Sequence, residues 1–496
     1  MGAVWSLVII GVAVLLILGI KLLGSPKTAR WGNRLAAIGM LVGLLALPDA
    51  GGEPVWQRDW DLNYLLIVSG IVVGLALGAL GAYSVKMTAM PQMVALFNGL
   101  GGGAAALVGG LEFARAAATQ PEPLILPFGD PITGADLVIA PEFLRSVMPS
   151  SAAAMLFATL IGALAFTGSV VAYLKLNGKL ERPRLFRGQH IVNALLFIAA
   201  LALGGWLAFN ATGSGATALL LLLAVLALLF GVALVLPIGG ADMPVVISLL
   251  NSFTGLAVAA DGLVIGNLAM LVAGTLVGSS GTLLTLLMCR AMNRPVGNVL
   301  FGAFGSGGGG PAAAGALAGK SVKSIQADEA ALLLSYARQV VIVPGYGLAV
   351  AQAQHQVCEL AEELGQRGVE VCFAIHPVAG RMPGHMNVLL AEANIPYDQL
   401  HEMEAVNPVM ERVDVCLVIG ANDVVNPAAR EEPASPIYGM PIIEADRAKA
   451  VIVLKRSMAA GFAGIDNHLF YKDNTRMLFG DAKASLTALV SQVKAS

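Results

Sequence analysis

The sequence predicts a multi-span α-helical membrane bundle of about nine transmembrane helices, followed by an α/β domain with a doubly wound parallel sheet. Of 496 residues, 57% are hydrophobic and only 12% are charged, whereas soluble domains carry about 25% charged residues. Most of the chain before Arg290 is hydrophobic, and the part after Lys320 has the composition of a soluble protein. In that second part strand and helix patterns alternate, which is typical of a parallel sheet.

Nine hydrophobic stretches are long enough, or nearly so, to cross a bilayer, which requires about 20 apolar residues. The first is not a cleaved signal peptide, because its positive charges follow the apolar run instead of preceding it. We therefore assign residues 1–300 to a transmembrane domain. The stretches are Val4–Leu23, Trp31–Leu47, Leu62–Tyr83, Met90–Leu111, Ala152–Leu174, Ile191–Phe209, Thr217–Leu236, Val245–Ile265 and Leu268–Met288.

The charges of the connecting loops predict the orientation of the bundle. The first loop carries four basic residues, and the loop after the fifth stretch carries five basic residues and one acidic residue. The second loop holds four acidic residues and one arginine, and the loop after the fourth stretch holds five acidic residues and two arginines. Because positive loops stay in the cytoplasm, we expect the N-terminus outside. After nine spans, the part that follows Arg290 is then expected in the cytoplasm.

Small residues are abundant both within and after the spans. Gly99–Ala106 lies inside the fourth stretch, and small residues let membrane helices approach closely. Tight helix packing is the preferred interpretation, with a pore lining as the alternative. Residues 302–319 are almost all Gly, Ala, Ser and Pro, which predicts a linker over 301–320 that is flexible or forms at most a helical turn.

Residues 321–496 are predicted to form the α/β domain. The expected strands are Val340–Val343, Glu370–Ile375, Val415–Ile419, Pro441–Glu444, Val451–Leu454 and Met477–Phe479. The expected helices are Ala327–Tyr336, Leu348–Arg367, Met386–Ala393, Ala405–Arg412 and Ala482–Val493.

A glycine turn joins the first of these strands to the second helix. Gly345 and Gly347 follow the β-branched strand directly, as in the phosphate-binding half of a Rossmann-like dinucleotide fold. The first glycine would permit the turn, the second would let a pyrophosphate approach, and the helix N-terminus would attract the anion. The third position is Val350 rather than glycine, so an ordinary glycine turn before a helix is the alternative.

Polar and glycine-rich segments follow four of the predicted strands. In a parallel sheet the carboxyl ends of the strands lie along one edge, where ligands bind. The segments are Gly345–Gly347, His376–His385, Gly420–Pro427 and Lys455–Ser457. We therefore expect one nucleotide site at this edge.

The residues near this edge favour NADP(H) over NAD(H). Folds that bind NAD usually place an acidic residue at the end of the second strand, where this chain has His376 and Pro377. Lys455, Arg456 and Ser457 offer two cations and a hydroxyl, which suit a 2′-phosphate. The alternative is that the two cations form a solvated strand end.

Three polar residues near or within the spans are candidates for a proton or ion path, namely Asn98, Asp242 and Asn251. Hydrogen bonding between helices is the alternative for the asparagines, and an interfacial helix cap is the alternative for Asp242. The four cysteines show no spacing for a metal site or a disulfide framework, so we expect reduced thiols and no metal. With a net charge of −2 and no basic, aromatic-interleaved stripe, no nucleic-acid partner is expected.

Several long strings resemble the beta subunit of proton-translocating NAD(P) transhydrogenase over essentially the whole chain. Two strings lie in the membrane part, at Phe166–Ala172 and Gly239–Val246. The others lie in the α/β part, at Pro344–Gln354, Gly380–Ala393, Gly420–Asp423, Lys455–Met458 and Gly480–Lys483.

The resemblance implies a Re/Si-specific enzyme that couples hydride transfer between NAD(H) and NADP(H) to proton passage across the membrane. Residues 1–300 would then translocate protons and 321–496 would bind NADP(H), in an orientation reversed from ordinary dehydrogenases. NAD(H) would bind to one or more partner alpha subunits, within a dimer of the heteromeric unit. The bilayer would be the cell inner (cytoplasmic) membrane, crossed several times.

The resemblance also implies which residues contact NADP(H), with a mobile lid at Ser435–Pro441. The expected contacts beyond the glycine motif are Tyr346, Val378, Ala379, Gly380, Arg381, Met382, Pro383, Gly384, Gly420, Ala421, Asn422, Asp423, Val424, Val425, Asn426, Lys455, Arg456, Ser457, Met458, Ala459, Ala460, Gly461, Phe462, Asp481 and Ala482.

Two departures from the family pattern stand out. Some members carry a histidine inside the fourth span, where this chain has Asn98. Asparagine cannot titrate, so the proton carrier would be a water chain past Asn98, Asn251 and Ser252, or a group on another subunit. Asp446 replaces an expected aromatic residue, and we attach no function to it.

Asp423 is the residue that we expect to couple the nucleotide to the proton path. Nicotinamide carries a positive charge only when it is oxidised. The proton affinity of a nearby carboxylate would therefore change with the redox state of the cofactor. The alternative is that Asp423 only caps a turn.

Two other functions fit parts of the chain. One is a transporter or channel gated by a nucleotide-sensing domain, since Gly345-Tyr346-Gly347 also occurs in potassium filters. The other is a membrane-anchored dehydrogenase, although nine spans exceed what an anchor needs.

Overall fold

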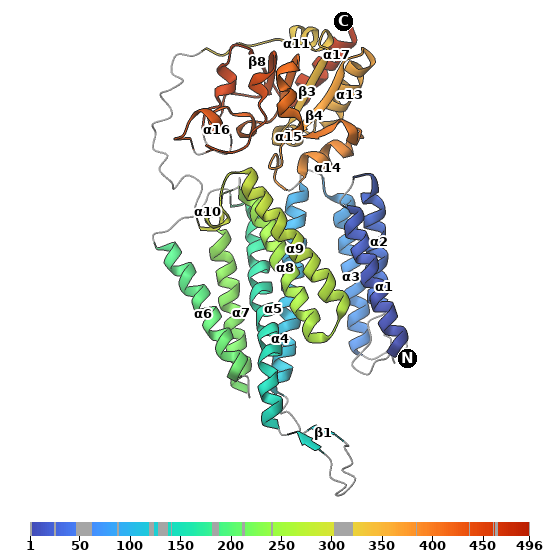
Figure 1. The fold of residues 1–496 in the computed structure, drawn as a ribbon, viewed down its shortest axis with the longest axis vertical. Coiled ribbons are helices and arrows are strands. Elements are labelled where there is room, and N and C mark those ends of the chain that lie inside the picture. Colours follow the sequence, from blue (N-terminus) through green and yellow to red (C-terminus); the bar gives the residue numbers. More distant parts are fainter. Residues whose placement is uncertain are drawn as a thin grey trace.

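The chain folds into a bundle of long helices beside an α/β part (Figure 1). The N-terminal end of the described chain lies at the end of the bundle far from the α/β part, in which the C-terminus lies. The computed structural model describes residues 2–23, 26–45, 62–86, 89–118, 124–126, 137–139, 141–180, 188–210, 214–239, 242–301, 321–382, 384–435, 437–459, 461 and 465–495. The predicted linker at 302–320 lies outside these residues.

The described part of the bundle contains nine long helices, one for each predicted stretch. They are α1 (Gly2–Leu23), α2 (Pro26–Leu45), α3 (Leu62–Ser84), α4 (Met90–Ala118), α5 (Pro141–Leu176), α6 (Gln189–Asn210), α7 (Ser214–Val235), α8 (Met243–Ile265) and α9 (Leu268–Ala291). Between α4 and α5, β1 (Leu124–Leu126) pairs with β2 (Leu137–Ile139), and a short helix, α10 (Val296–Phe301), follows α9.

Seven of these described helices, α3 to α9, are long and apolar enough to cross a membrane. Helix α1 counts only as a shorter apolar helix over Leu7–Leu23. Helix α2 begins with a polar segment that contains Lys27, Arg30 and Arg34, which reduces its apolar length. A multi-pass membrane protein is therefore supported, and the number of nine spans stays a prediction.

Glycines let the central helices touch along their backbones. A Cβ at Gly102 of α4 would lie 2.9 Å from the carbonyl oxygen of Gly162 on α5. A Cβ at Gly281 of α9 would lie 2.8 Å from the backbone nitrogen of Ser252 on α8. Any larger residue would push these helices apart, so the interpretation of the glycine-rich spans as tight packing is confirmed.

The α/β part contains a six-stranded parallel sheet in the order β5-β4-β3-β6-β7-β8. The chain builds outward from β3 through β4 to β5, then returns to the other side of β3 and builds outward through β6, β7 and β8. Between the carboxyl ends of β3 and β6 the direction reverses, and such switch points hold ligands in doubly wound sheets. The strands are β3 (Gln339–Pro344), β4 (Glu370–Ile375), β5 (Leu400–Glu402), β6 (Val415–Ile419), β7 (Ala450–Lys455) and β8 (Thr475–Phe479).

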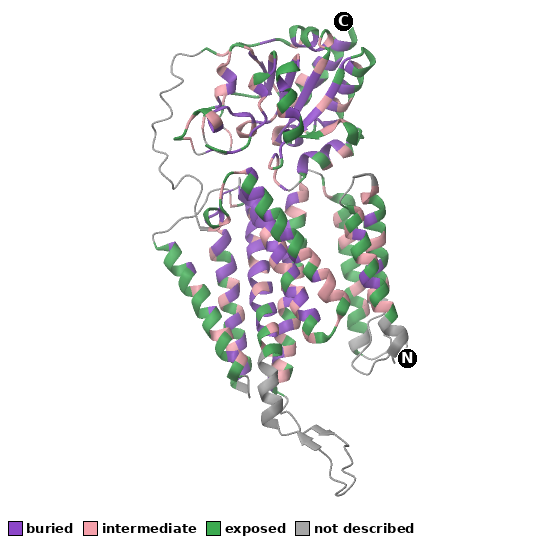
Figure 2. Cartoon of the chain, in the orientation of Figure 1, coloured by how far each residue is buried: buried purple, intermediate pink, exposed green. Residues whose placement is uncertain are grey.

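Apolar side chains of the central strands alternate between two cores. Val340, Ile342 and Leu417 pack on one face under four helices, and Val341, Val343 and Cys416 pack on the other face. The helices of the first face are α11 (Ala327–Ser335), α13 (Gln354–Gln366), α14 (His385–Glu392) and α17 (Ala482–Ala495). Figure 2 shows this burial in the sheet and in the centre of the bundle, whereas α6 is largely exposed.

The structure corrects three of the predicted elements. The helix expected at Leu348–Arg367 is split into α12 (Tyr346–Val350) and α13, because Gln352 between them adopts a left-handed φ of 49°. The strand expected at Pro441–Glu444 is absent, and β5, with only Leu400 apolar, takes an edge of the sheet. The helix expected at Ala405–Arg412 is α15 (Met403–Val406) followed by the 3₁₀ helix η6 (Asn407–Arg412). Pro408 lies at its start and has no N–H to continue an α-helix.

Asp414 joins three strands at the amino end of the sheet. Its Oδ2 accepts hydrogen bonds from the backbone N–H groups of Arg338 (2.9 Å) and Gln339 (3.2 Å), and its Oδ1 accepts one from Lys449 Nζ (2.7 Å). The hydrogen bonds from Lys449 and the backbone lower the pKa of Asp414 to about 2.

We predict that Asp414→Ala lowers the free energy of unfolding of the 321–496 segment by about 1–3 kcal/mol, because two backbone donors lose their acceptor. Lys449→Met should cost less, since exposed ion pairs contribute little. A depressed pKa stabilises the fold above the unfolded-state value of about 3.9, and this stability is lost as the pH falls through about 2. Urea titrations at pH 7 and pH 2 measure the difference. Equal effects of the two substitutions at pH 7 would contradict the assignment.

Candidate functional site

A cavity of about 540 Å³ opens at the carboxyl ends of β3, β6 and β7, at the switch point of the sheet. This volume lies within the range of roughly 300–1,000 Å³ that is usual for ligand pockets. The lining residues predicted from the sequence are Gly345, Tyr346, Gly347, Val350, Val378, Ala379, Gly380, Gly420, Ala421, Asn422, Asp423, Val424, Lys455, Arg456, Ser457, Ala459, Gly461, Asp481 and Ala482.

Three glycines hold the floor of this cavity together. The N–H of Gly345 donates to the carbonyl of Ile419 (2.8 Å), and the N–H of Gly347 donates to the carbonyl of Gly420 (2.9 Å). A Cβ at Gly347 would lie 2.6 Å from the Cα of Gly420, so only glycine permits this contact. The helix that begins at the turn is the five-residue α12 and not one long helix, since α13 begins only at Gln354. Anion binding at this helix N-terminus stays a prediction.

Tyr346 lies at the centre of a stacked group on one wall. The guanidinium carbon of Arg381 lies 4.4 Å from the centre of the tyrosine ring, and the ring of His385 lies 6.1 Å away. The backbone N–H of Arg381 donates to His385 Nδ1 at 3.0 Å. Burial and the nearby Arg381 charge lower the pKa of His385 to about 4, so this imidazole is neutral at pH 7 and has a structural role.

His376 connects the end of β4 to the segment 437–443. Its Nδ1 accepts from the N–H of Val378 at 3.2 Å, so Nε2 carries the hydrogen and donates to the carbonyl of Pro441 at 2.8 Å. Burial lowers the pKa of His376, which keeps this tautomer neutral. The same segment supplies Ile437 and Met440 to the cavity wall. The predicted lid therefore forms one side of the cavity, except for Pro436, which lies outside the described residues.

Charged side chains gather at the end of β7. Lys455 Nζ donates to the carbonyl of Ala459 (2.5 Å) and lies 4.7 Å from the centre of the Phe470 ring. Burial lowers the pKa of Lys455, and the negative charge of Asp423 opposes this shift. Arg456 is exposed at the rim. The cavity therefore has one half-buried cation, Lys455, near a carboxylate, and one exposed cation, Arg456.

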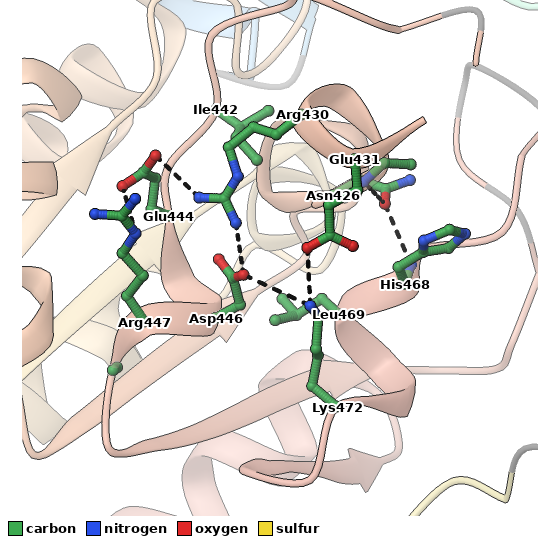
Figure 3. A network of polar contacts seen from close by, with 12 residues as sticks. Asn426, Arg430, Glu431, Ile442, Glu444, Asp446, Arg447, His468, Leu469 and Lys472 are labelled. Carbon is green, nitrogen blue, oxygen red and sulfur yellow. Dashed lines mark hydrogen bonds and ion pairs between the residues drawn. The ribbon is translucent and has the colours of Figure 1, made fainter. Parts of the chain in front are cut away.

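A network of polar contacts fixes the segment after η7 (Asp423–Val425). Arg430 pairs with Glu444 (2.9 Å) and with Asp446 (2.6 Å), and Arg447 pairs with Glu444 (3.0 Å), as Figure 3 shows. Asn426 is fully buried, and its side chain bonds to three backbone groups, at Asp466, Ala428 and His468. Asp446 therefore has a structural partner.

Some predicted contact residues do not line the cavity. Asn426 and Val425 are buried inside the loop, Arg381 lies behind Tyr346, and Met382, Gly384 and Met458 are also absent from the lining. Pro383, Ala460 and Phe462 lie outside the described residues. Ala351, Leu454 and Gly480 line the cavity and were missed, although each adjoins a predicted residue. Met292 was also missed, because no sequence signal connects the end of α9 to this edge.

The cavity lies against the membrane bundle. Met292 lines it directly, and the side-chain amide of Asn293 donates to the carbonyl of Tyr438 at 3.0 Å. At a second contact, Arg381 donates to the carbonyl of Leu176, the last residue of α5, at 3.3 Å. Val378 packs against the same apolar cluster of the bundle as Met292. A change in the cavity wall can therefore reach two membrane helices.

Asp242 forms an ion pair immediately below this contact. Its carboxylate is fully buried, and both oxygens accept from Arg294 Nη1, at 2.7 and 2.8 Å. Although Asp242 precedes α8, its side chain makes no cap hydrogen bond. The alternative of an interfacial cap is therefore wrong.

The other membrane candidates do not form one cluster. Asn98 is buried in α4, where its side chain donates to Ser169 Oγ (3.3 Å) and its carbonyl accepts from Thr254 Oγ1 (3.3 Å). Ser252 bonds instead to Gly278 and Thr282 of α9, and Asn251 is half-buried. Asp261, a buried acid within the eighth stretch, was not among the predicted residues.

Comparison with known proteins agrees with this architecture. The family model described as "NAD(P) transhydrogenase beta subunit" matches residues 5–492. The NAD(P) transhydrogenase subunit beta of Rhodospirillum rubrum is 46% identical over 478 residues, which cover 96% of both chains. A second Rhodospirillum rubrum sequence with the same name matches with the same identity and coverage. The chain therefore belongs to the family of NAD(P) transhydrogenase beta subunits, membrane proteins in which hydride transfer between NAD(H) and NADP(H) is coupled to proton translocation.

Proposed function

We propose that this chain is the NADP(H)-binding subunit of a Re/Si-specific, proton-translocating transhydrogenase. Residues 321–496 would form a Rossmann-like NADP(H) domain, 301–320 a linker and 1–300 the proton-translocating domain. NAD(H) would bind to a partner alpha subunit. The observation that carries this proposal is the position of the cavity, which lies at the switch point of the sheet. Met292 at the end of α9 lines it, and Arg381 behind its wall bonds to the end of α5.

The residues of the cavity fit a dinucleotide. Gly345, Gly347 and Gly420 keep its floor free of side chains. Gly461 has a similar role, because a Cβ there would lie 2.6 Å from Asp423 Oδ1. Lys455, Arg456 and Ser457 would hold the 2′-phosphate, and the bound nicotinamide would supply the hydride chemistry. The expected occupant thus explains both the glycines and the cations.

Asp423 is the group that we propose couples this site to the membrane. It lines the cavity, and the carbonyl of its neighbour Val424 accepts a hydrogen bond from the N–H of Ile443 (2.9 Å). Ile443 belongs to the segment whose Tyr438 is held by Asn293. A change in charge near Asp423 would therefore act on a segment that touches the bundle.

The same geometry supports the proposed orientation in the membrane. The described N-terminal end and the α/β part lie at opposite ends of the bundle (Figure 1), as an odd number of spans requires. With positive loops inside, the N-terminus would face outside and the α/β part the cytoplasm, in a cell inner membrane. Gly345-Tyr346-Gly347 lies in the α/β part and bonds to the end of β6 and the loop after it, so it does not line a pore.

We predict that Arg456→Ala weakens NADP(H) binding by about 1.5–3 kcal/mol, the usual scale of a charged hydrogen bond, and leaves the weaker binding of NAD(H) unchanged. Isothermal titration calorimetry of the purified 321–496 segment measures both affinities. Arg412→Ala, at another exposed arginine outside the cavity, is the matched control. Equal loss of both nucleotides with Arg456→Ala would overturn the 2′-phosphate assignment.

We predict that the 321–496 segment binds NADP(H) but transfers no hydride to an NAD analogue unless the alpha subunit is added, because the cavity at the sheet is assigned to NADP(H) and the NAD(H) site is assigned to the partner. Stopped-flow absorbance of reduced nicotinamide follows the transfer. Turnover by the segment alone would place both nucleotide sites in this chain.

We predict that Asp423→Asn retains the fold and most NADP(H) affinity but abolishes proton-coupled turnover, because the amide cannot titrate. Proton uptake by vesicles that contain the complete enzyme measures the coupled reaction. Hydride exchange between bound NADP(H) and alternating NAD(H) and its analogue needs no net proton movement, so it should fall much less. Normal pumping by the variant would make Asp423 a structural residue.

A further inference from the structure

Asp261 is the acidic residue on α8 that the proposed function leaves unused. Its side chain is 1% exposed, and neither carboxyl oxygen has a hydrogen-bond partner among the described residues. Ionisable groups within membrane helices are costly and usually mark a functional site. Asp242 at the other end of α8 differs, because Arg294 neutralises it.

The packing around Asp261 leaves room for its carboxyl group between α4 and α8. A Cβ at Gly109 of α4 would lie 3.1 Å from Asp261 Oδ1, so a glycine is needed opposite the acid. Gly110, beside it on α4, faces the buried hydroxyl of Thr159 on α5, which is 3.7 Å from the position of its Cβ. The acid is therefore enclosed by small residues, with one hydroxyl near the same level of the bundle.

No cation faces Asp261 from the helices packed against α8, as far as their side chains are described. On α4, Arg115 pairs with Glu112 at 2.8 Å and is exposed. Lys175 lies in the last turn of α5, where it bonds to the carbonyls of Leu236 and Ile238. Arg290 lies in the last turn of α9, and α10 has no charged residue. These ends of α5 and α9 face the α/β part (Figure 1).

The position of Asp261 along the bundle complements that of Asn98. Thr254, whose hydroxyl bonds to the carbonyl of Asn98, and Asp261 are seven residues apart on α8, two turns along one face and about 10 Å in height. Asp261 and Asp242 are about 28 Å apart along the same axis. The chain thus has one carboxyl near each end of α8 and a polar contact between them.

We propose that Asp261 binds and releases the translocated proton in the half of the membrane that lies away from the α/β part. This rests on the proposed function, and it assigns to a residue of this chain the titratable group that Asn98 cannot provide. The carboxyl group takes up one proton, becomes neutral, and returns to the carboxylate when the proton leaves. No other reactant is needed.

The test compares Asp261→Asn, Asp261→Glu and the wild type in vesicles that contain the complete enzyme. Asp261→Asn should reduce proton uptake about 100-fold or more, the scale of a lost acid–base group, while hydride exchange on bound NADP(H) stays near the wild-type rate. Asp261→Glu should restore uptake. Wild-type pumping by Asp261→Asn, or an equal loss of pumping and exchange, would overturn the inference.

A second measurement separates this inference from the proposed function. Infrared spectra of the wild type minus Asp261→Asn should show the carbonyl band of a protonated carboxylic acid that disappears as the pH rises. A band that is absent at every pH would overturn the role of Asp261, even if the enzyme transfers hydride. A titrating band in a complex that transfers no hydride would support proton binding at Asp261 and would contradict the proposed function instead.

Discussion

Backbone contact between the turn after β3 and the turn after β6 is the constraint on which the cavity depends. Gly345 and Gly347 donate to Ile419 and Gly420, and no side chain fits between these segments. The contact fixes the two strand ends at the point where the sheet changes direction. Asp423 and Lys455 then reach the cavity from neighbouring strands. A Cβ at Gly347 would lie 2.6 Å from the Cα of Gly420 and would force the two turns apart.

The corner after α9 carries this arrangement into the membrane. Three consecutive residues face three different groups: Met292 lines the cavity, Asn293 bonds to Tyr438, and Arg294 pairs with the buried Asp242 at the start of α8. Because these residues are consecutive in the chain, we expect a shift of the cavity wall to displace the charge that neutralises Asp242. This gives a physical route for coupling, and linkage makes any such effect reciprocal.

The sequence predicted the fold well where hydrophobic patterns are long. All nine apolar stretches appear as helices, and five of the six strands were found, because buried parallel strands such as Val415–Ile419 are continuous apolar runs. β5 was missed because an edge strand of three residues has no such run. The break at Gln352 was missed because a left-handed glutamine is set by tertiary packing and leaves no sequence signal.

The site residues that were predicted correctly are those in the segments that directly follow a predicted strand. The glycines, Asp423 and Lys455 meet in one cavity, as the rule for parallel sheets requires. Asn426 has an amide that could bind a ligand, but this amide hydrogen-bonds to backbone groups inside its own loop. The sequence does not indicate these bonds. Met292 was not predicted, because it lines the cavity only through the contact between the bundle and the α/β part. Asp261 could have been found, since an acid inside an apolar stretch is a signal in itself.

Hydrogen–deuterium exchange of the full-length chain in lipid tests the central claim, that the nucleotide cavity and the bundle are mechanically linked. The account predicts that NADP⁺ slows amide exchange both in residues 437–443 and in the corner at 292–294, and that NAD⁺ at the same concentration has a smaller effect. Protection of the cavity loops with unchanged exchange at the corner would contradict it.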